Sequence, residues 1–346
     1  MALDNKKMFR YGGLGSEGAT FGTPVDAEFH IDGISSTLDS PKSAEYTVPS
    51  GLSRAPRRKV RAYYAPVGTL EYPWDIETIG YNLMYALGPY VFTAAEAPAT
   101  INTHEFYGDD NIVPRYFTTR IGKDKFEHIF DGCAMNALTF NVGEGILNIV
   151  NDIVARRDTK DDLTAYDSLL LPTDVPMAFH NVTSTIGSNP ADISAKVRTL
   201  TLAIRNNIDV NRGRNIGSEY PRRHRFGARA VEYSTTLEFE DLNMLEKFWG
   251  GATGPATIGS TFVDDFKIKF APHQVGETPE ARYLEILLPQ VDVKTSTISP
   301  RGSDALYHEI SGAAYIDEVT LLGATKVNTD IYVKLLNNSA QYYVEA

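Results

Sequence analysis

Residue types that could support chemistry occur at several places, and the most conspicuous is a glycine-rich run near the start of the chain. The sequence G-L-G-S-E-G at residues 13–18 matches the G-x-G-x-x-G pattern of loops that cradle the phosphates of a dinucleotide. Such a loop follows a strand and opens a helix. Here only Tyr11 and Gly12 precede the run, and F-G-T-P at residues 21–24 disfavours a helix after it. We therefore expect residues 1–24 to form a mobile glycine-rich arm.

Neighbouring carboxylates could act as an acid and a base, or could bind calcium. Asp109 and Asp110 with Asp131 form one such set, and Asp264 with Asp265 forms another. Neither set has the D-x-[DN]-x-[DN]-G spacing of a calcium loop, and adjacent acids in a strand point to opposite faces. We interpret these residues as solvated loop acids.

The seven histidines and the single cysteine offer no catalytic arrangement either. The histidines are scattered, and none has the spacing with a glutamate that a zinc hydrolase helix requires. Cys133 lies in an apolar stretch, which is typical of a buried structural thiol. The sequence therefore predicts no catalytic site, no metal site and no cofactor.

Two basic clusters stand out against a formal net charge of −11, which disfavours a protein whose whole surface grips nucleic acid. The first comprises Arg54, Arg57, Arg58, Lys59 and Arg61, and the second comprises Arg205, Arg212, Arg214, Arg222, Arg223, Arg225 and Arg229. They could contact phosphates, or they could dock on the acidic surface of a neighbouring copy, since arginine forks pair well with carboxylates. We favour docking.

Length and composition indicate a folded, mainly β protein. The chain has 346 residues, which exceeds the roughly 250–300 residues at which a single core stops growing, so we expect two domains. It contains 19 Tyr and 16 Phe, which suit half-buried strands. One cysteine excludes an intrachain disulfide, and no apolar run is long enough for a signal peptide or membrane span. We expect folding in a cytosol and no contact with a membrane.

Alternation of apolar and polar residues predicts the strands. In residues 231–240, Val231, Tyr233, Thr235, Leu237 and Phe239 point one way, while Glu232, Glu238 and Glu240 lie on the polar side. Similar runs occur at residues 134–142, 200–204 and 266–270. Two short helices are predicted. One has Asp75 as its N-cap and ends at Gly88-Pro89, and the other runs from about Leu242 to Trp249.

The order of elements after each helix is similar, which predicts an internal repeat. After the first helix we expect strands at residues 116–121, 126–130, 134–142 and 145–155. After the second we expect them at residues 262–270, 283–288, 291–298 and 306–315. A boundary in the region of residues 158–173 divides the chain into residues 1–165, the arm and first domain, and residues 166–346, the second domain and C-terminal tail.

Three stretches resemble a known family. Residues 15–24 resemble an opening "G-x-E-x-x-[FY]-G-T", and residues 130–142 resemble a strand "y-x-G-C-x-v-n-s-l-t-l". Residues 202–208 followed by residues 232–241 resemble an "l-x-i-x-N-n" strand and the strand that leads into a helix. In this order, over roughly residues 12–315, they resemble the large major tail tube proteins of siphophages.

The resemblance implies a mainly β fold with two related antiparallel β-sandwich or barrel tube domains, each with a short flanking α-helix. It implies a structural protein of the virion tail, assembled in the host cytoplasm, that forms rings which stack into a hollow conduit for viral DNA. A ring would hold three duplicated chains with pseudo-six-fold symmetry, or six chains. Tape-measure, tail terminator and tail tip proteins are the implied partners, and DNA would pass through the lumen without specific binding.

Two site predictions follow for such a conduit. Arg205, Arg212, Arg214, Arg222, Arg223 and Arg225, with Arg54, Arg57 and Arg58, are predicted to dock on neighbouring copies, since arginines lining the bore would hold DNA back. Glu232, Glu238 and Glu240 are predicted to line the lumen, where acids repel DNA. An alternative function is a β-sandwich tail component that binds a receptor or carbohydrate, and a virion-bound hydrolase is more distant.

Overall fold

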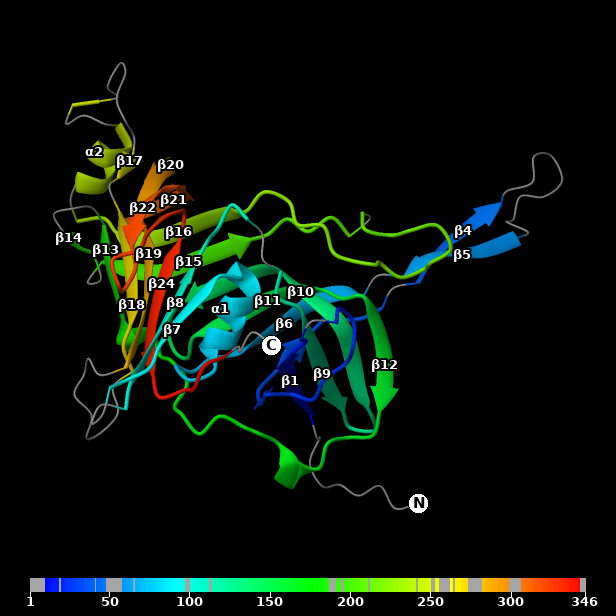
Figure 1. Cartoon of the computed structure of the whole chain (residues 1–346). Helices are drawn as coiled ribbons and strands as arrows, with labels where there is room; N and C mark the ends of the chain where they lie inside the picture. The colour runs from blue at the N-terminus through cyan, green and yellow to red at the C-terminus, as the bar shows by residue number, and fades with distance from the viewer. Residues whose placement is uncertain are drawn as a thin grey trace.

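The computed structural model describes residues 10–18, 20–40, 42–47, 58–64, 66–96, 100–111, 114–186, 191–193, 196–210, 212–240, 242–249, 253–254, 262–263, 265–272, 282–298 and 306–342. Within these residues the chain is mainly β, its sheets are antiparallel, and its two α-helices are short (Figure 1). The predicted fold class, a mainly β sandwich with flanking helices, is confirmed.

One layer is a long antiparallel sheet. Its eight principal strands lie in the order β20 (Gln290–Ile298), β21 (Tyr307–Tyr315), β16 (Ala230–Glu238), β15 (Val197–Arg205), β10 (Glu127–Val142), β11 (Asn148–Val154), β6 (Val67–Pro73) and β3 (Ser35–Ser36). The two-residue strand β17 (Phe262–Val263) pairs with the beginning of β20. We call this layer the long sheet.

The two faces of the long sheet differ in polarity. On β16, Tyr233 and Leu237 are buried, whereas Glu232 and Glu238 are exposed. Because side chains alternate between faces along a strand, one face packs into the core and the other stays polar.

The second layer consists of two groups of strands that cover the apolar face. The first group is β2 (Phe29–Ile31), β1 (Arg10–Ser16), β9 (Phe117–Lys123), the first half of β10, and β12 (Arg157–Asp161). The second is β14 (Ala191–Asp192), β13 (Val182–Ile186), β18 (Phe266–Phe270), β19 (Tyr283–Leu288), β24 (Tyr332–Asn337), β8 (Asn102–Tyr107) and β7 (Tyr90–Thr93). Strand β10 belongs to both layers, and the register breaks where it passes Gly132, whose φ is +59°.

Two hairpins stand apart from these layers. One pairs β4 (Lys42–Thr47) with β5 (Arg58–Tyr64) and projects from the body of the molecule, at the right of Figure 1. The other pairs β22 (Asp317–Thr320) with β23 (Lys326–Thr329). Two short 3₁₀ helices, Tyr166–Ser168 and Phe179–Asn181, lie between β12 and β13.

The helices lie near their predicted positions. Helix α1 (Ile79–Leu87) is almost entirely buried, and α2 (Asn243–Trp249) contacts β20. Asp75 was predicted to cap the first helix, but its Oδ1 accepts hydrogen bonds from the Glu77 and Thr78 amides in a turn that precedes α1. The helix ends at Gly88, as predicted.

Pairing in the structure repeats along the chain. In the first half, β6 pairs with β11 and β11 with β10; in the second, β16 pairs with β21 and β21 with β20. A bulge lies between Met135 and Ala137 in β10 and at the equivalent point between Val293 and Thr295 in β20. The second-layer orders β2-β1-β9-β10-β12 and β14-β13-β18-β19-β24 also correspond. We call these two sets the first unit and the second unit; the division after residue 165 stays a prediction.

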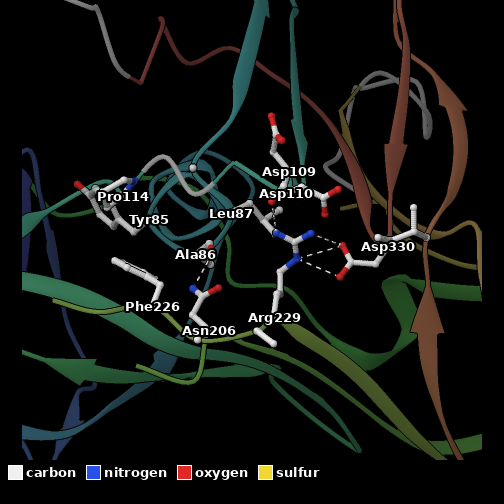
Figure 2. A pocket seen from close by; sticks show the side chains of 14 residues that line it. Tyr85, Ala86, Leu87, Asp109, Asp110, Pro114, Asn206, Phe226, Arg229 and Asp330 are labelled. Atoms are coloured by element: carbon white, nitrogen blue, oxygen red, sulfur yellow. Dashed lines mark hydrogen bonds and ion pairs between the residues drawn. The ribbon is translucent and has the colours of Figure 1, made fainter. Parts of the chain in front are cut away.

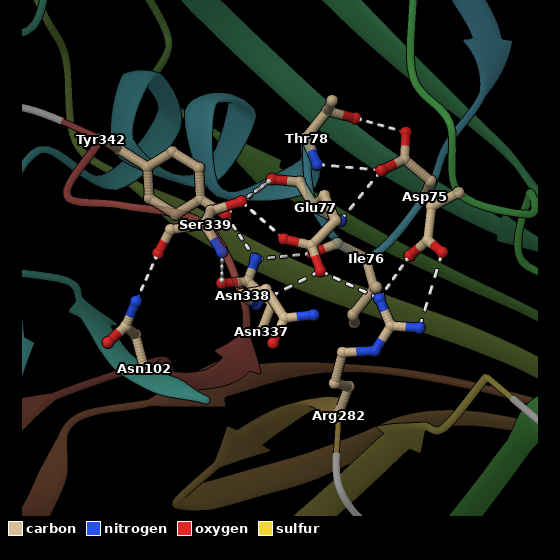
Figure 3. A network of polar contacts seen from close by, with 11 residues as sticks. Asp75, Ile76, Glu77, Thr78, Asn102, Arg282, Asn337, Asn338, Ser339 and Tyr342 are labelled. Carbon is tan, nitrogen blue, oxygen red and sulfur yellow. Dashed lines mark hydrogen bonds and ion pairs between the residues drawn. The ribbon is translucent and has the colours of Figure 1, made fainter. Parts of the chain in front are cut away.

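The two units are joined in both layers. Strand β10 of the first unit pairs with β15 of the second, and β24 of the second unit pairs with β8. A polar network adds to the joint (Figure 3): the Arg282 guanidinium, whose side chain is 4% exposed, bridges Glu77 (Nη1···Oε1 2.9 Å) and Asp174 (Nη1···Oδ2 2.8 Å). The Tyr342 hydroxyl donates to the Glu77 carbonyl oxygen at 2.7 Å, which ties the C-terminal segment to the turn before α1.

The prediction of a mobile arm is wrong for those of its residues that the structure describes. Residues 10–16 form β1, which pairs with β9 along its whole length, and Tyr11 and Leu14 are buried. The glycines here serve close packing, since a Cβ on Gly15 would lie 2.1 Å from the Asp26 carbonyl oxygen. The G-x-G-x-x-G match is therefore part of a strand and not a phosphate-binding loop.

Replacing Leu14 with Ala tests this correction. Because the Leu14 side chain is completely buried, the L14A variant should lose about 2–5 kcal/mol of unfolding free energy, measured by urea denaturation. The matched control is L170A at a residue that is 56% exposed, which should change stability little. Equal stability of L14A and the unmodified protein would contradict the packing of β1 in the core and would support the prediction of an arm.

Candidate assembly surfaces

The loop of residues 206–229, between β15 and β16, carries most of the second basic cluster and is anchored on the first unit. The Asn206 side-chain amide donates to the carbonyl oxygens of Ala86 at 2.8 Å and Met135 at 2.9 Å. His224 Nε2 lies 2.7 Å from the Gly132 carbonyl oxygen. Phe226 packs against the buried cluster that contains Ala134, and the base of this loop is therefore fixed on the long sheet.

Four of the predicted docking arginines meet at one place on this loop. Arg214, Arg222, Arg223 and Arg225 line a hollow of about 310 Å³ together with Gly213 and Asn215. Arg222, Arg223 and Arg225 are exposed, and the Arg222 amide donates to the Gly213 carbonyl oxygen at 2.8 Å. We call this feature the arginine hollow. A hollow lined by several arginines favours an anion, and the planar guanidinium matches the geometry of a carboxylate.

The other predicted docking arginines are placed differently. Arg205 pairs with Glu232 (Nε···Oε2 3.2 Å), and Arg212 pairs with Asp209 (Nε···Oδ2 3.0 Å). Arg54 and Arg57 lie outside the described residues, and the side chain of Arg58 does as well. The structure thus brings together one residue predicted for docking, Arg205, and one predicted for the lumen, Glu232.

Arg229 belongs to the predicted basic cluster but has a structural partner (Figure 2). Its guanidinium forms two-pronged contacts with Asp330 (Nη2···Oδ1 2.8 Å), and its Nη1 donates to the Asp109 carbonyl oxygen at 3.1 Å. The two side chains are only 16% and 10% exposed. They line a hollow of about 280 Å³ at the end of α1, where Arg229 ties the loop to Asp330, which lies between β23 and β24.

The predicted lumen acids lie on the polar face of the long sheet. Glu232 and Glu238 are exposed on β16, and Glu240 follows the strand and lies 3.4 Å from the Lys196 ammonium. Register places further acids on this face, which sequence reasoning missed because they come from separate strands: Glu71, Asp152, Asp292 and Glu309. Arg205 shares the face, which nonetheless has an excess of acids.

Not all the acids that we interpreted as solvated loop residues are in contact with solvent. Asp131 is completely buried, and its carboxylate lies 2.7 Å from Arg157 Nη2. Burial raises the pKa of Asp131, while the Arg157 hydrogen bond and charge act in the opposite direction. The interpretation of Asp131 was therefore wrong, whereas Asp110 is exposed and Asp264 lies outside the described residues.

The cysteine and the possible metal ligands can also be placed in the described part of the chain. Cys133 is buried, as predicted, and burial raises the pKa of its thiol. Among the residues that the structure describes, no three His, Cys, Asp or Glu side chains gather in a way that would hold a metal ion. Over the same residues, no helix has the length and apolar character needed to cross a membrane.

Titration of His224 should couple the anchored loop to pH. Burial lowers the pKa of His224 to about 4, so the folded protein keeps this ring neutral where the unfolded chain, with a pKa of 6.5, takes up a proton. The stability that His224 supports is present above pH 6.5 and is lost as pH falls toward 4. The loss reaches about 2 kcal/mol at pH 5.

We expect H224Q to show a smaller drop in unfolding free energy between pH 7 and pH 5 than the unmodified protein does, by about 2 kcal/mol. The control H180Q changes an exposed histidine and should keep the full drop. A drop of the same size in H224Q and the unmodified protein would contradict the buried, neutral state of His224.

Comparison with known proteins gives the family. A search of curated proteins finds no match. A family model described as phage tail tube protein matches residues 16–286, which is most of the chain and includes strands of both units. It covers the anchored loop, the arginine hollow and the acids of β16. The chain therefore belongs to the phage tail tube protein family and is a structural component of phage tails.

Proposed function

We propose that this chain is the major tail tube protein, that three copies close into a ring, and that stacked rings form the conduit for viral DNA. The observation that supports the ring is the pair of free ends of the long sheet. Among the described strands the sheet ends at β3 on one side, and on the other β17 covers only Val291 and Asp292 of β20. Strand edges left open in this way pair with other chains.

The pairing of the two units within the chain supports a specific form for the joint between copies. Within the chain, Thr139 of β10 lies opposite Ala203 of β15, and Phe140 lies opposite Leu202. In the repeat, β20 corresponds to β10 and β3 corresponds to β15. Asp39 forms a β-bridge with Val67, just as Ala203 pairs with Glu232 at the corresponding position. Leu38 is buried, as is the corresponding Leu202.

The correspondence predicts the register between copies. Thr297 of β20 stands where Thr139 stands in β10, so it should lie opposite Asp39 of the next copy. Such an interface is heterologous, and it closes into a ring when the rotation at each joint divides a full turn. With two units per chain, three copies give six equivalent positions.

The size and polarity of such a ring suit a conduit. Three copies of eight strands give a barrel about 48 Å across between backbones at a strand spacing of about 4.8 Å and a tilt of about 40°. The second layer covers the apolar face of the sheet, so the polar face turns inward. Glu232, Glu238 and Glu240 would then line or border the lumen, where an excess of acids keeps DNA from binding.

The remaining roles follow from this assembly. The arginine hollow is proposed to dock on acids of another copy, and Arg212 on the same loop adds to that basic surface. Assembly takes place in the host cytoplasm, with tape-measure, tail terminator and tail tip proteins as partners. The chain carries no catalytic function in this scheme.

A disulfide between copies tests the ring. The double variant D39C/T297C should form a cross-link between neighbouring copies under oxidation, because directly opposed residues in an antiparallel pair bring their Cβ atoms to about 4.5–5.5 Å. Denaturing gels should show linear dimers and trimers and a closed trimer. Both positions are exposed in the single chain, and Cys133 is buried, so the engineered thiols react selectively.

The control is A203C/T139C, whose two residues lie opposite each other within one chain. This variant should form a disulfide within one copy and give no cross-linked dimers or trimers. The offset pair D39C/T295C should react more slowly. Assembled tubes without the D39C/T297C cross-link, when the internal control reacts, would exclude β3 and β20 as the ring joint. Cross-linked species that extend to a closed hexamer would exclude the three-chain ring.

Reversing charge on the polar face tests the lumen. We expect E232K/E238K to assemble normally, since the exposed Arg205–Glu232 pair contributes only about 0–1 kcal/mol. Particles that carry the variant should release DNA more slowly, because lysines in the bore attract phosphates. The control D162K/D167K changes the same number of exposed acids on the connection between the units. Release at the unmodified rate by E232K/E238K would remove this face from the bore.

A further inference from the structure

The anchored loop presents an apolar side chain to solvent at its apex. Ile216 is the most exposed large apolar side chain among the described residues, and its surface is entirely accessible. Arg222, Arg223 and Arg225 follow on the same loop and are exposed as well. Burial of an exposed isoleucine by a partner is favourable, because apolar surface leaves water. We call residues 213–222 the loop tip.

The loop tip is held in a fixed shape. The Arg222 amide closes it by donating to the Gly213 carbonyl oxygen at 2.8 Å. Tyr64 of β5 supports it from the side: its amide donates to the Glu219 carbonyl oxygen at 3.3 Å, and its ring packs edge to face on Tyr220 with centroids 5.8 Å apart. Because the tip is ordered in the single chain, docking would cost little conformational entropy.

The loop lies at one end of the long-sheet strands. Strand β15 enters it after Arg205, β16 leaves it at Ala230, and these two residues lie opposite each other. From there the loop runs toward hairpin β4–β5 (Figure 1). The opposite end of the same strands holds the turn of residues 143–147, since Val142 at the end of β10 lies opposite Leu200 near the start of β15. We call these two ends the loop end and the turn end.

The turn end carries two exposed apolar side chains. Ile146 is 63% exposed and Val175 is 64% exposed. They belong to neighbouring segments, because Ile146 forms a β-bridge with Ala178 and the Leu147 amide donates to the Met177 carbonyl oxygen at 2.8 Å. We call Ile146 and Val175 the turn-end patch.

Charge beside the turn-end patch complements the loop tip. Glu144 lies in the same turn, its side chain is 81% exposed, and it pairs with Arg198 (Oε1···Nη2 3.1 Å). An ion pair that is so exposed contributes little to stability, so the carboxylate can accept a guanidinium from another copy at small cost. An apolar group beside arginines thus lies at one end of the sheet, and apolar groups beside a carboxylate lie at the other.

We propose that the loop tip of one copy docks, through Ile216, on the turn-end patch of a copy in the next ring. The inference rests on the proposed stacking of rings, because head-to-tail stacking brings the loop end of one ring to the turn end of the next. The occupant of the patch is a second copy of this chain. Glu144 of that copy then lies among the acids that receive the arginine hollow.

Removal of the apolar groups tests the docking. The variants I216S and I146S/V175S should each raise the concentration for half-maximal tube assembly by about tenfold or more, because each removes apolar burial from the contact. The three substitutions combined should weaken assembly by less than the product of the two separate effects, since both remove the same contact. Sedimentation of tubes gives the assembled fraction. Thermal unfolding of dilute protein should be unchanged, because all three side chains are exposed.

The matched control is L322S, which changes an exposed leucine on hairpin β22–β23 and should assemble normally. Assembly of either I216S or I146S/V175S at the unmodified concentration would overturn the docking. Effects that multiply in full in the triple variant would overturn it as well, since they would show that the two surfaces meet different partners.

Cross-linking distinguishes this contact from the ring. In assembled tubes, I216C/I146C or I216C/V175C should form a disulfide between copies, and the cross-linked species should extend past three copies because stacking is open-ended. The D39C/T297C species should instead stop at a closed trimer. Tubes that give the closed trimer but no cross-link in either I216C variant would overturn the docking alone. Tubes that cross-link through I216C but not through D39C/T297C would support the docking and contradict the proposed ring joint.

Discussion

The backbone pairing of β10 with β15 is the interaction on which the rest of the structure depends. It places the first unit beside the second in one continuous sheet, and it fixes their register through pairs such as Thr139 with Ala203. This pairing also determines which strands lie at the ends of the sheet. Among the described strands, β15 occupies β10, whereas the equivalent strand β20 is paired only at its beginning, by the two-residue strand β17, and the equivalent edge β3 lies at the other end of the sheet. In the proposed ring, a chain built from two such units would carry half of the same joint on each side.

Only one face of this sheet is buried, so the sheet separates a packed core from a polar, solvent-exposed face. The second layer and α1 cover the apolar face, where residues such as Tyr233 and Phe140 are buried, and the other face keeps its acids in contact with solvent. The arginines are arranged to complement this. Arg229 and Arg282 are held in nearly buried ion pairs that fix the loop and the inter-unit joint, whereas Arg222, Arg223 and Arg225 remain exposed. These three exposed arginines thus belong to the loop of residues 206–229, whereas Arg205 on the acidic face is paired with Glu232.

Much of this could be predicted from the sequence because the strands of the long sheet alternate clearly. The run from Val231 to Glu238 and the stop at Gly88 gave β16 and the end of α1 within a residue or two. Strand β1 was missed because its glycines resemble an arm. Its burial depends on β9, about a hundred residues away, which no local pattern reveals.

The site was harder to predict for the same reason. Asp131 looks like a loop acid until Arg157 is placed beside it, and Arg205 and Glu232 were assigned to separate surfaces although adjacent strands bring them together. The acids Glu71, Asp152 and Glu309 join the polar face only through register. The convergence of four arginines on one hollow likewise depends on the path of the loop.

The most direct test is an electron cryomicroscopy map of tubes assembled from the purified chain. The account predicts rings of three copies in which β20 of one copy pairs with β3 of the next, Thr297 lies opposite Asp39, and Glu232 and Glu238 face the bore. Rings of six chains, or tubes in which the β3 edge contacts no neighbouring strand, would contradict it.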